Sequence, residues 1–577
     1  MHNGGGEILA YCRMDGFRTE LAGYGQFLCR IRSVMISNER TRRSTARMAA
    51  PLVALLACVA AATGIAQAQP DSMTWYVRAG AAPGGSGEVG APFESLARAE
   101  AASRAGDTIV IQPAAAALDG GIALKPGQRL VGGGAEVIGA PDGAELPRLT
   151  NTTGDNDGDA VRLAPGVQVR NLVIDGAQRG GIYGHDAVDA VISGNRVTGT
   201  NRRCADGFMI GPFTLPPGIA VGLAADPLPE FIVLNNGWAA IMADFSAATG
   251  TIRIEGNIVH DTACGDGIDI RAHGTSVVDA RLRDNAIRDI NLGLAKLSVL
   301  ALGLQAGDTA RLTAELVGNQ QIGIAPLSSP LNHLADSEGL FINPMDRAVM
   351  EVTVDRNEFR DGHGNFSANG LEYVTTNGTP QSRVTVSNST FEHVRGDIIE
   401  SYNLSTEGAR QSLSLNNVSA FHSTFPAAVL NPVIPANLGS CLVTTNFGRT
   451  GSTHLEVADS RFGDCSADGI GLISYTPTGP EPATAQLTFD IRDTTITGTA
   501  ANGLAIVNVG DTDVVRGSID RTSVSGVRGK LIDSRNTGVI GSVAMEFGTG
   551  TLDGAAVSCL AADHPRVELS AFAATCR

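Results

Sequence analysis

Residues 257–287, NIVHDTACGDGIDIRAHGTSVVDARLRDNAI, contain one full period of the pattern that decides the fold. A short phrase, Asn257-Ile-Val259, is followed by a second phrase, Asp266-Gly-Ile-Asp-Ile270, and the first phrase then returns as Asn285-Ala-Ile287. Each phrase joins a small polar residue to a short apolar strand. One such unit cannot bury its apolar side alone, so neighbouring units must stack. The stretch therefore predicts an all-β solenoid.

The first phrase returns along most of the chain, at steps of 24 to 62 residues. It begins at Asn171, Asn195, Asn257, Asn285, Asn319, Asn357, Ser389, Asn416, Ser460, Thr494 and Thr522. The 62-residue step, from Asn195 to Asn257, can contain an additional coil with a weak phrase near Asn236. The other long steps can each contain one coil plus an insertion. We expect this polar column to be structural, because stacked Asn side chains at a turn bond to one another and to the backbone.

The second phrase predicts another strand in each coil, opened by Gly, Asn or Asp. Side chains of a strand alternate between its two faces, so Ile268/Ile270 and Leu371/Tyr373 should point inward. The residues between them should form a column open to solvent. That column is predicted to contain Tyr183, Met209, Asp269, Glu372, Glu400, Gly471 and Ala505.

The start of the chain has the features of an export signal. Residues 50–66 are apolar, four arginines precede them, and Ala66-Gln-Ala68 follows, which predicts cleavage after Ala68. A transmembrane anchor and a lipoprotein signal at Cys58 are the alternatives. Residues 1–34 have no clear pattern and are expected to precede the true start, at Met35 or Met48, with the signal region spanning 35–69.

The charge balance bears on partners. The 577 residues carry a net charge of −16, and omitting the first 69 residues, which hold eight basic and four acidic side chains, brings it near −20. Such a surface repels nucleic acid and anionic membranes, so we expect no nucleic-acid partner.

Six cysteines follow the signal: Cys204, Cys264, Cys441, Cys465, Cys559 and Cys576. An even number in an exported chain favours disulfides, and six cysteines allow 15 pairings. In a solenoid, nearest neighbours are the simplest choice, which predicts Cys204–Cys264, Cys441–Cys465 and Cys559–Cys576. A zinc site is disfavoured because no Cys-x-x-Cys spacing occurs.

The segment that opens the mature chain resembles a known superfamily. A strand at Trp75–Arg78 precedes a helix predicted over Pro92–Arg104, then the strand Gly106-Asp-Thr-Ile-Val-Ile111 and the phrase Leu124-Lys-Pro-Gly-Gln-Arg-Leu-Val-Gly132. This order looks like the N-terminal cap and first coil of pectate-lyase-like right-handed parallel β-helix proteins. The resemblance implies an N-terminal capping region, assigned to 70–120, and a right-handed parallel β-helix, assigned to 121–555. The predicted Cys559–Cys576 pair would close the tail over 556–577. It implies little about function, since this fold carries lyases, hydrolases, adhesins and structural proteins.

Two carboxylates in the outward column lie one coil apart. Glu372 and Glu400 are separated by 28 residues, so they should stack at about 4.8 Å, the spacing of neighbouring strands. Such a pair raises the pKa of one of its two carboxyl groups or recruits a cation. It can serve as acid and base, or hold Ca²⁺ against a uronic-acid substrate. Asp269 lies on the same face, and Arg271, two residues further, is the better candidate base for a lyase. The candidate catalytic residues are thus Asp269, Arg271, Glu372 and Glu400. An acidic face that merely keeps the sheet soluble is the competing interpretation.

Other motifs are incomplete. Gly362-His-Gly364 and Asp266-Gly-Ile-Asp269 resemble parts of polygalacturonases, but the adjacent Asp-Asp pair and the Arg-Ile-Lys segment of that family are absent. Lysine occurs only at Lys125, Lys296 and Lys530. His185 and His273, beside glycines, are interpreted as turn residues.

Two functions remain open. The first is a secreted or periplasmic, monomeric module that binds carbohydrate or a cell-envelope surface without catalysis, and without a cofactor or metal. The second is a polysaccharide lyase or glycoside hydrolase that acts on an acidic polysaccharide in a groove on the second-strand sheet, with Ca²⁺ as a possible cofactor if it is a lyase. Pro-rich insertions at 212–229, 326–344, 426–435 and 477–482 are expected either to line one edge of that groove or to decorate turns, where long loops are tolerated.

Overall fold

The chain winds through three long parallel sheets, here named A, B and C. The computed structural model describes residues 72–133, 145–214, 231–293, 298–324, 336–362, 368–405, 407–424, 439–447, 450–475, 483–509, 514–536, 542–558, 567–569 and 572–576. Successive strands enter sheet A, then C, then B, and each pairs with the strand one coil earlier. This is a right-handed parallel β-helix, as the sequence predicted.

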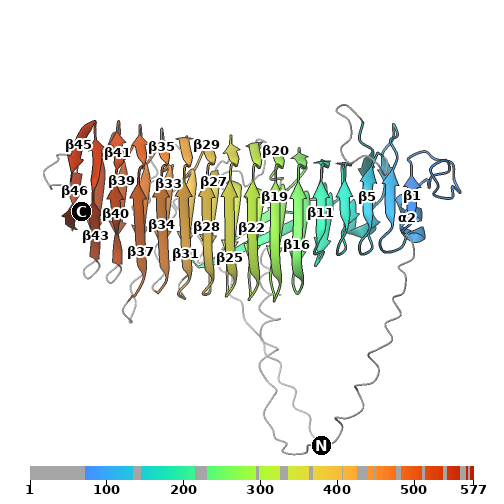
Figure 1. Ribbon diagram of the computed structural model, residues 1–577, viewed down its shortest axis with the longest axis horizontal. Helices are drawn as coiled ribbons and strands as arrows, with labels where there is room; N and C mark the ends of the chain where they lie inside the picture. The colour runs from blue at the N-terminus through green and yellow to red at the C-terminus, as the bar shows by residue number, and fades with distance from the viewer. Residues whose placement is uncertain are drawn as a thin grey trace, which may run out of the picture. The chain divides into compact units, whose positions relative to one another are not determined.

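The strands stand side by side in chain order (Figure 1). Sheet A contains β1 (Thr74–Val77), β2 (Thr108–Ile111), β5 (Arg129–Gly132), β8 (Gln168–Arg170), β11 (Ala190–Ser193), β16 (Thr249–Glu255), β19 (Val277–Arg283), β22 (Arg311–Val317), β25 (Val349–Asp355), β28 (Gln381–Ser387), β31 (Arg410–Asn416), β34 (Ser452–Ala458), β37 (Gln486–Arg492), β40 (Val514–Asp520), β43 (Ser542–Phe547) and β47 (Phe572–Cys576). Sheet B, which holds the second phrases, contains β4 (Ile122–Ala123), β7 (Val161–Arg162), β10 (Ile182–His185), β15 (Ile241–Phe245), β18 (Ile268–Ala272), β21 (Ser298–Ala306), β24 (Asp336–Pro344), β27 (Asn369–Thr375), β30 (Ile399–Asn403), β33 (Leu442–Asn446), β36 (Ile470–Ser474), β39 (Leu504–Asn508), β42 (Ile532–Asn536) and β46 (Val567–Leu569). Sheet C, which follows the polar column, contains β3 (Leu118–Asp119), β6 (Arg148–Thr150), β9 (Val173–Asp175), β12 (Arg196–Thr198), β17 (Ile258–His260), β20 (Ala286–Ile290), β23 (Gln320–Ile324), β26 (Glu358–Arg360), β29 (Thr390–Val394), β32 (Ser419–Ser423), β35 (Arg461–Gly463), β38 (Thr495–Thr497), β41 (Thr522–Ser525), β44 (Thr549–Leu552) and β45 (Ala555–Ser558).

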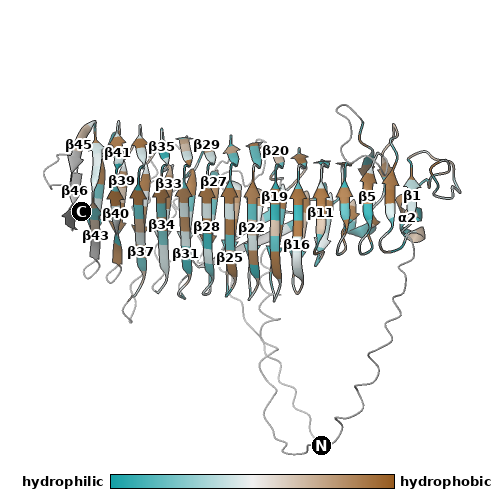
Figure 2. Cartoon of the chain, in the orientation of Figure 1, coloured by the Kyte–Doolittle hydropathy of each residue, from teal (hydrophilic) through white to brown (hydrophobic). Residues whose placement is uncertain are grey.

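The core lies between the three sheets and is built by alternation along the strands. Ile268, Ile270, Leu371 and Tyr373 are all fully buried in it, as predicted. Hydrophilic and hydrophobic residues accordingly interleave along the strands of sheet A (Figure 2). Inside the core, the rings of Phe359 and Phe391 stack on neighbouring coils, with centroids 5.2 Å apart.

The polar column forms a hydrogen-bonded ladder between sheets A and C. Asn257 Oδ1 accepts hydrogen bonds from the backbone N and from Nδ2 of Asn195, both at 3.0 Å. The same pair of bonds links Asn257 to Asn285, Asn285 to Asn319, and Asn319 to Asn357. Each of these buried side chains satisfies backbone groups at the turn, so the column stabilises the stack.

Two members of the predicted column are misplaced. Leu172, not Asn171, stands at the ladder position and donates its N–H to Asn195 Oδ1 at 3.1 Å, while Asn171 takes the left-handed turn before it with φ 56°. Likewise Val418, not Asn416, stands at the ladder position. The error at Asn171 arises because Asn also favours the left-handed conformation needed at the turn before the ladder. In the second case Asn417 takes that turn, with φ 55°, and Asn416 is the last residue of β31.

The 62-residue step contains one coil with an insertion, not a hidden coil. β11 pairs directly with β16, and β12 with β17. The extra length forms an antiparallel hairpin of β13 (Asp206–Thr214) and β14 (Phe231–Gly237). The predicted second strand at Asp206–Ile210 is therefore wrong, and β15 takes its place in sheet B. The insertion predicted over 326–344 is also wrong in its second half, which is β24.

A short helix, α2 (Leu96–Ala102), packs Leu96 and Ala99 into the first coils. It begins after Ser95 rather than at Pro92, because the Ser95 side chain accepts a hydrogen bond from Arg98 N and caps the helix. A 3-10 turn, η1, spans Asp155–Gly158. No helix among the residues that the structure describes is long and apolar enough to cross a membrane.

Two of the predicted disulfides are present. Cys204 pairs with Cys264 and Cys441 with Cys465, with Cα–Cα distances of 5.1 and 5.6 Å. The third predicted pair includes Cys559, which lies outside the described residues, as do the signal region, Lys296 and His363.

Candidate functional site

The outward column of sheet B follows one register across the coils. Its described members are Tyr183, Met242, Asp269, Gly303, Phe341, Glu372, Glu400, Val443, Gly471, Ala505 and Asp533. Met242 stands where Met209 was predicted, since Met209 belongs to the hairpin. The column thus carries three of the four candidate catalytic residues.

Glu372 and Glu400 are direct register partners on β27 and β30, as their spacing predicted. Phe341 precedes them in the column and Val443 follows. Asn369 Nδ2 donates a hydrogen bond to Glu400 Oε2 at 2.9 Å. The two carboxylates therefore lie in a largely apolar row with one amide fixing Glu400.

The expectation that this column is open to solvent is wrong for most of its length. Glu372 is 8% exposed, and Asp269 and Phe341 are fully buried. Beside them, Leu300, Phe341 and Val374 form an apolar cluster outside the main core. Alternation correctly separates the two faces of a strand, but it cannot tell whether the outer face is covered.

Burial changes the proton affinity of neighbouring groups. Burial, followed by the charges of Glu400, Asp397 and Glu372, raises the pKa of Tyr402 well above its usual value. Burial also raises the pKa of Asp397 to about 7, although the N–H groups of Gly439 and Ser440 bond to its Oδ1 at 2.9 and 2.6 Å. The charge of Asp468 adds to this rise. Tyr402 and Asp397, in this buried part of the molecule, therefore keep their protons to a higher pH than the free side chains do.

Asp269 and Arg271 lie apart from the glutamate pair. Arg271 pairs in register with Asp244 and Gln305, and three strand steps separate β18 from β27. Three steps correspond to about 14 Å, so Arg271 cannot act on a bond held between Glu372 and Glu400. Burial and the neighbouring Asp266 raise the pKa of Asp269 well above its usual range.

The two described lysines are held by other groups. Lys125 Nζ binds the carbonyl oxygens of Glu100, at 2.5 Å, and Ser103 at the end of α2. Lys530 pairs with Asp533 at 3.0 Å. Neither stands beside the candidate carboxylates as a base.

A second group of side chains on the outer face escaped prediction. Tyr183 and Trp238 meet edge to face with centroids 5.0 Å apart, and the Arg179 guanidinium lies 4.1 Å from the Trp238 ring centroid. We call Tyr183, Trp238 and Arg179 the aromatic cluster. Arg179 binds Asp159 through Nε and Nη2, at 2.9 and 2.6 Å. Burial alone would lower the pKa of Arg179, but the hydrogen bonds and charge of Asp159 outweigh this effect and the net shift is upward. Arg179 therefore stays positively charged despite its burial.

Next to the aromatic cluster, two imidazoles flank one carboxylate. His185 Nδ1 lies 3.1 Å from Asp244 Oδ2, and His273 Nε2 lies 3.2 Å from Asp244 Oδ1. We call these three residues the His-Asp-His cluster. The His185 side chain is 50% exposed and that of His273 is 30% exposed. This end of the face is therefore open, in contrast to the centre.

The interpretation of His185 and His273 as mere turn residues missed Asp244, because β15 was not foreseen. The signal available in the sequence was weak: Asp244 lies 59 residues from His185, across the hairpin. Within the described part of the chain, no group of three His, Cys, Asp or Glu side chains is arranged to hold a metal ion.

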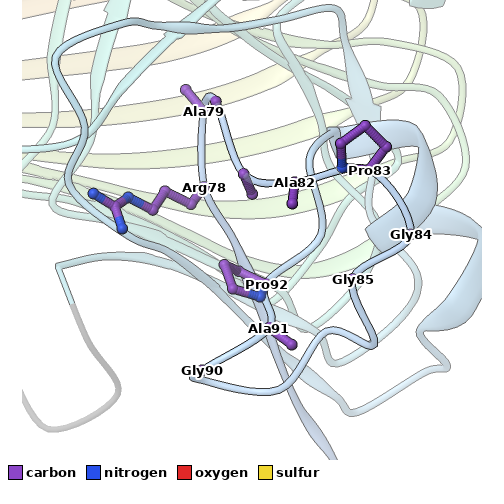
Figure 3. Close-up of a pocket in the computed structure, with 11 residues that line it drawn as sticks. Arg78, Ala79, Ala82, Pro83, Gly84, Gly85, Gly90, Ala91 and Pro92 are labelled. Carbon is purple, nitrogen blue, oxygen red and sulfur yellow. The ribbon is translucent and has the colours of Figure 1, made fainter.

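A hollow of about 560 Å³ also occurs in the N-terminal loop (Figure 3). It is lined by Arg78, by Gly80, Gly84, Gly85 and Gly90, and by alanines and prolines of the same loop. Arg78 is its single ionisable side chain, so the hollow lacks the groups that acid–base chemistry needs.

Comparisons with known proteins bear on the fold. No protein-family model matches the sequence, and no curated protein matches it. Among solved structures, the crystal structure of pectate lyase Pel9A is similar, with 12% sequence identity over 81% of this chain and 79% of that chain, and a TM-score of 0.24. A likeness at this level assigns no chemistry to this chain.

Proposed function

We propose that this protein is an exported β-helix module that binds carbohydrate without catalysis, through the outer face of sheet B. The observation that carries the proposal is the aromatic cluster beside the His-Asp-His cluster, at the open end of that face. Carbohydrate sites combine an aromatic surface, which packs against the C–H face of a sugar ring, with a few fixed polar groups that bond its hydroxyls.

The open end of sheet B supplies both elements. Tyr183 is partly exposed, and its ring is held in place by Trp238 and Arg179. The guanidinium carbon Cζ of Arg179 lies 5.2 Å from the Tyr183 ring centroid. Two residues further along β10, His185 offers a donor or acceptor. Asp244 Oδ2 lies within hydrogen-bond distance of His185 Nδ1. Asp244 Oδ1, which lies 3.2 Å from His273 Nε2, has no hydrogen-bond partner among the described residues and can accept one from a ligand. This preorganised set favours binding, because little side-chain entropy is lost when a ligand arrives.

Export is part of the proposal. The charged, apolar and small-residue order of residues 40–68 is typical of a secretory signal. The Cys204–Cys264 and Cys441–Cys465 disulfides support an oxidising location, since such bonds persist mainly outside the cytosol.

The test is a panel of immobilised neutral and acidic polysaccharides probed with the disulfide-bonded chain. We expect retention on at least one polysaccharide, and its loss in His185→Ala and Tyr183→Ala. Phe421→Ala is the matched control, since Phe421 is a partly exposed aromatic residue on sheet C. Absence of retention on every polysaccharide, or equal retention by all four proteins, would contradict the proposal.

A lyase or hydrolase that acts on an acidic polysaccharide is the second candidate. The register pairing of Glu372 with Glu400 favours it, because an acid and a base must face one bond. Its test is the ultraviolet absorbance of unsaturated products and a reducing-sugar assay on uronic-acid polysaccharides, with and without Ca²⁺. Product formation that is lost in both Glu372→Gln and Glu400→Gln would establish this candidate. Absence of product in both assays would dismiss it.

A further inference from the structure

The stem of the β13–β14 hairpin joins a disulfide to the aromatic cluster. Cys204 lies two residues before β13, and Trp238 directly follows β14. The Trp238 N–H donates a hydrogen bond to the carbonyl oxygen of Ala205, at 2.9 Å. Cys204 is bonded to Cys264, which belongs to the following coil. The position of Trp238 is therefore tied to the residue next to the disulfide.

Asn201 connects the same stem to the rest of the aromatic cluster. It is fully buried, and its N–H donates a hydrogen bond to the carbonyl oxygen of Arg179, at 2.7 Å. Its side chain accepts a hydrogen bond from the Ala205 N–H, at 2.8 Å, and donates to the carbonyl oxygens of Ala205 and Cys264. Its backbone is left-handed, with φ 56°, which Asn adopts more readily than most residues. One buried side chain therefore links the segments that carry Arg179, Trp238 and the disulfide.

The end of the stem lies directly against the following coil. A Cβ at Gly237 would lie 2.5 Å from the Cα of Gly265, and a Cβ at Gly265 would lie 2.7 Å from the carbonyl carbon of Gly237. Two backbones approach this closely only where side chains are absent, so both positions require glycine. The disulfide keeps the two segments in contact, because it bonds the start of the stem to Cys264, the residue before Gly265.

Sheet pairing attaches the hairpin to the coils at one point. Among the described residues, this pairing consists of Asn236 opposite Ser298, and a hydrogen bond from Asn236 Nδ2 to Asp266 adds a second contact. The coils themselves are paired without the hairpin, since β12 pairs with β17, and β15 pairs with both β10 and β18. Loss of the disulfide should therefore loosen the stem while the ladders of the coils persist.

We propose that the Cys204–Cys264 disulfide and Asn201 position Trp238 for carbohydrate binding, so that the binding site is assembled only in the oxidised chain. This inference rests on the proposed function and adds its regulation. Trp238 meets the Tyr183 ring edge to face, so a displaced Trp238 removes the support of Tyr183 and the site loses its preorganisation. Because disulfides persist mainly outside the cytosol, the site becomes competent on export.

The disulfide can be opened chemically in the folded chain. Cys204 is partly exposed, whereas Cys264 is 3% exposed, so a dithiol has access to one side of the bond. Dithiothreitol supplies two electrons and two protons: the S–S bond breaks, both sulfurs become thiols, and dithiothreitol becomes its cyclic disulfide.

Trp238 reports on its own position, independently of any saccharide. The chain contains two tryptophans, so Trp75→Phe leaves Trp238 as the single reporter. We call Cys204→Ala with Cys264→Ala, made in this background, the stem variant. We expect the fluorescence emission of Trp238 to shift to longer wavelength, and its quenching by acrylamide to increase, both in the stem variant and after reduction of the parent with dithiothreitol.

The matched control removes the other described disulfide. Cys441→Ala with Cys465→Ala, in the same background, should leave the emission and the quenching of Trp238 unchanged, because this pair lies away from the hairpin in later coils. Far-ultraviolet circular dichroism checks that the coils of every variant remain folded. Asn201→Gly provides a test with the disulfide intact, since glycine keeps the left-handed backbone and removes the side chain. It should also shift the emission of Trp238.

The affinity for saccharide is then measured with the polysaccharide that retains the wild type in the panel. The stem variant and Asn201→Gly should each bind it about tenfold more weakly or worse, because the preorganisation of the site is lost. The control pair should bind it as the parent does.

Unchanged Trp238 emission in both the stem variant and Asn201→Gly would overturn the positioning role. A shifted emission with unchanged affinity would overturn its link to binding. Failure of the proposed function is distinguishable from either result: no polysaccharide then retains the wild type, the dependence of binding on the disulfide falls with it, and the emission shift alone remains.

Discussion

Glu372 and Glu400 occupy the same outward position on neighbouring strands of sheet B, and Glu372 is almost completely buried there. Like charges that stand directly opposite in a sheet repel each other, and burial strengthens the effect because less water screens the charges. The pair is tolerated in part because Asn369 donates a hydrogen bond to Glu400. Such a placement has consequences for stability whether or not the pair performs catalysis.

Glu372→Gln should therefore stabilise the fold at about pH 8. The substitution keeps the size of the side chain and removes one of the two charges, which we expect to raise the free energy of unfolding by about 1 kcal/mol. Urea denaturation followed by circular dichroism measures the change. A loss of more than about 1 kcal/mol would show that the Glu372 carboxylate makes a stabilising contact that outweighs the repulsion.

The asparagine ladder should respond strongly to a single deletion. Asn285→Ala removes the acceptor of Asn257 N and Nδ2 and the donor to the Ile254 carbonyl, and leaves these buried groups unsatisfied. We expect a loss of about 3 kcal/mol, since each orphaned buried group costs about 1–3 kcal/mol. The control is Thr313→Ala at an exposed position of β22, expected to change stability by less than about 0.5 kcal/mol. Similar urea midpoints for the two variants would contradict a structural role of the ladder.

Asp397 should make stability depend on pH. Its pKa is raised from 3.8 to about 7, so between these values the folded state holds a proton that the unfolded chain has lost. The contribution of Asp397 to stability is then fully present below the unfolded value of 3.8, decreases as the pH rises to about 7, and is absent above that. The full shift corresponds to about 4 kcal/mol.

Asp397→Asn should remove this dependence, because an amide does not titrate. The variant should match the wild type at about pH 4 and exceed its stability at about pH 8. Urea midpoints measured across this range test the sign. A wild-type chain whose stability rises between about pH 4 and pH 7, with the variant parallel to it, would show that Asp397 is ionised in the folded state.

Each disulfide should contribute to stability through the chain it closes. The sequence separations are 60 residues for Cys204–Cys264 and 24 for Cys441–Cys465. Loop-closure entropy predicts about 4 kcal/mol for the first and somewhat less for the second. Replacing each pair by Ala, and comparing urea midpoints of the variants, measures both. No loss in either double variant would mean that the pairs do not form in the native chain.

Much of the scaffold was predictable because it depends on local, repeated chemistry. The register of Glu372 with Glu400 follows from one uninterrupted coil of 28 residues. The pairing of the two observed disulfides followed from the stacking of neighbouring coils. Side-chain alternation assigned Ile268 and Leu371 to the core correctly.

What failed depends on contacts that a repeat does not encode. The hairpin of β13 and β14 replaced an expected strand, because a Gly-containing apolar segment such as 206–210 suits an antiparallel pair as well as a parallel sheet. Asn171 was misassigned because the ladder and the adjacent left-handed turn both favour Asn. The burial of Asp269 and the approach of Asp244 to two histidines depend on packing between distant segments, which single-residue patterns do not report.

The central claim is that carbohydrate binds at the open end of sheet B, and hydrogen exchange tests it most directly. Amide exchange of the disulfide-bonded chain is measured by mass spectrometry with and without a polysaccharide retained in the panel. We predict slower exchange in peptides that cover β10 and β15, which carry Tyr183, His185 and Asp244, and no change in His185→Ala. Protection confined to β27 and β30, around Glu372 and Glu400, would contradict the claim.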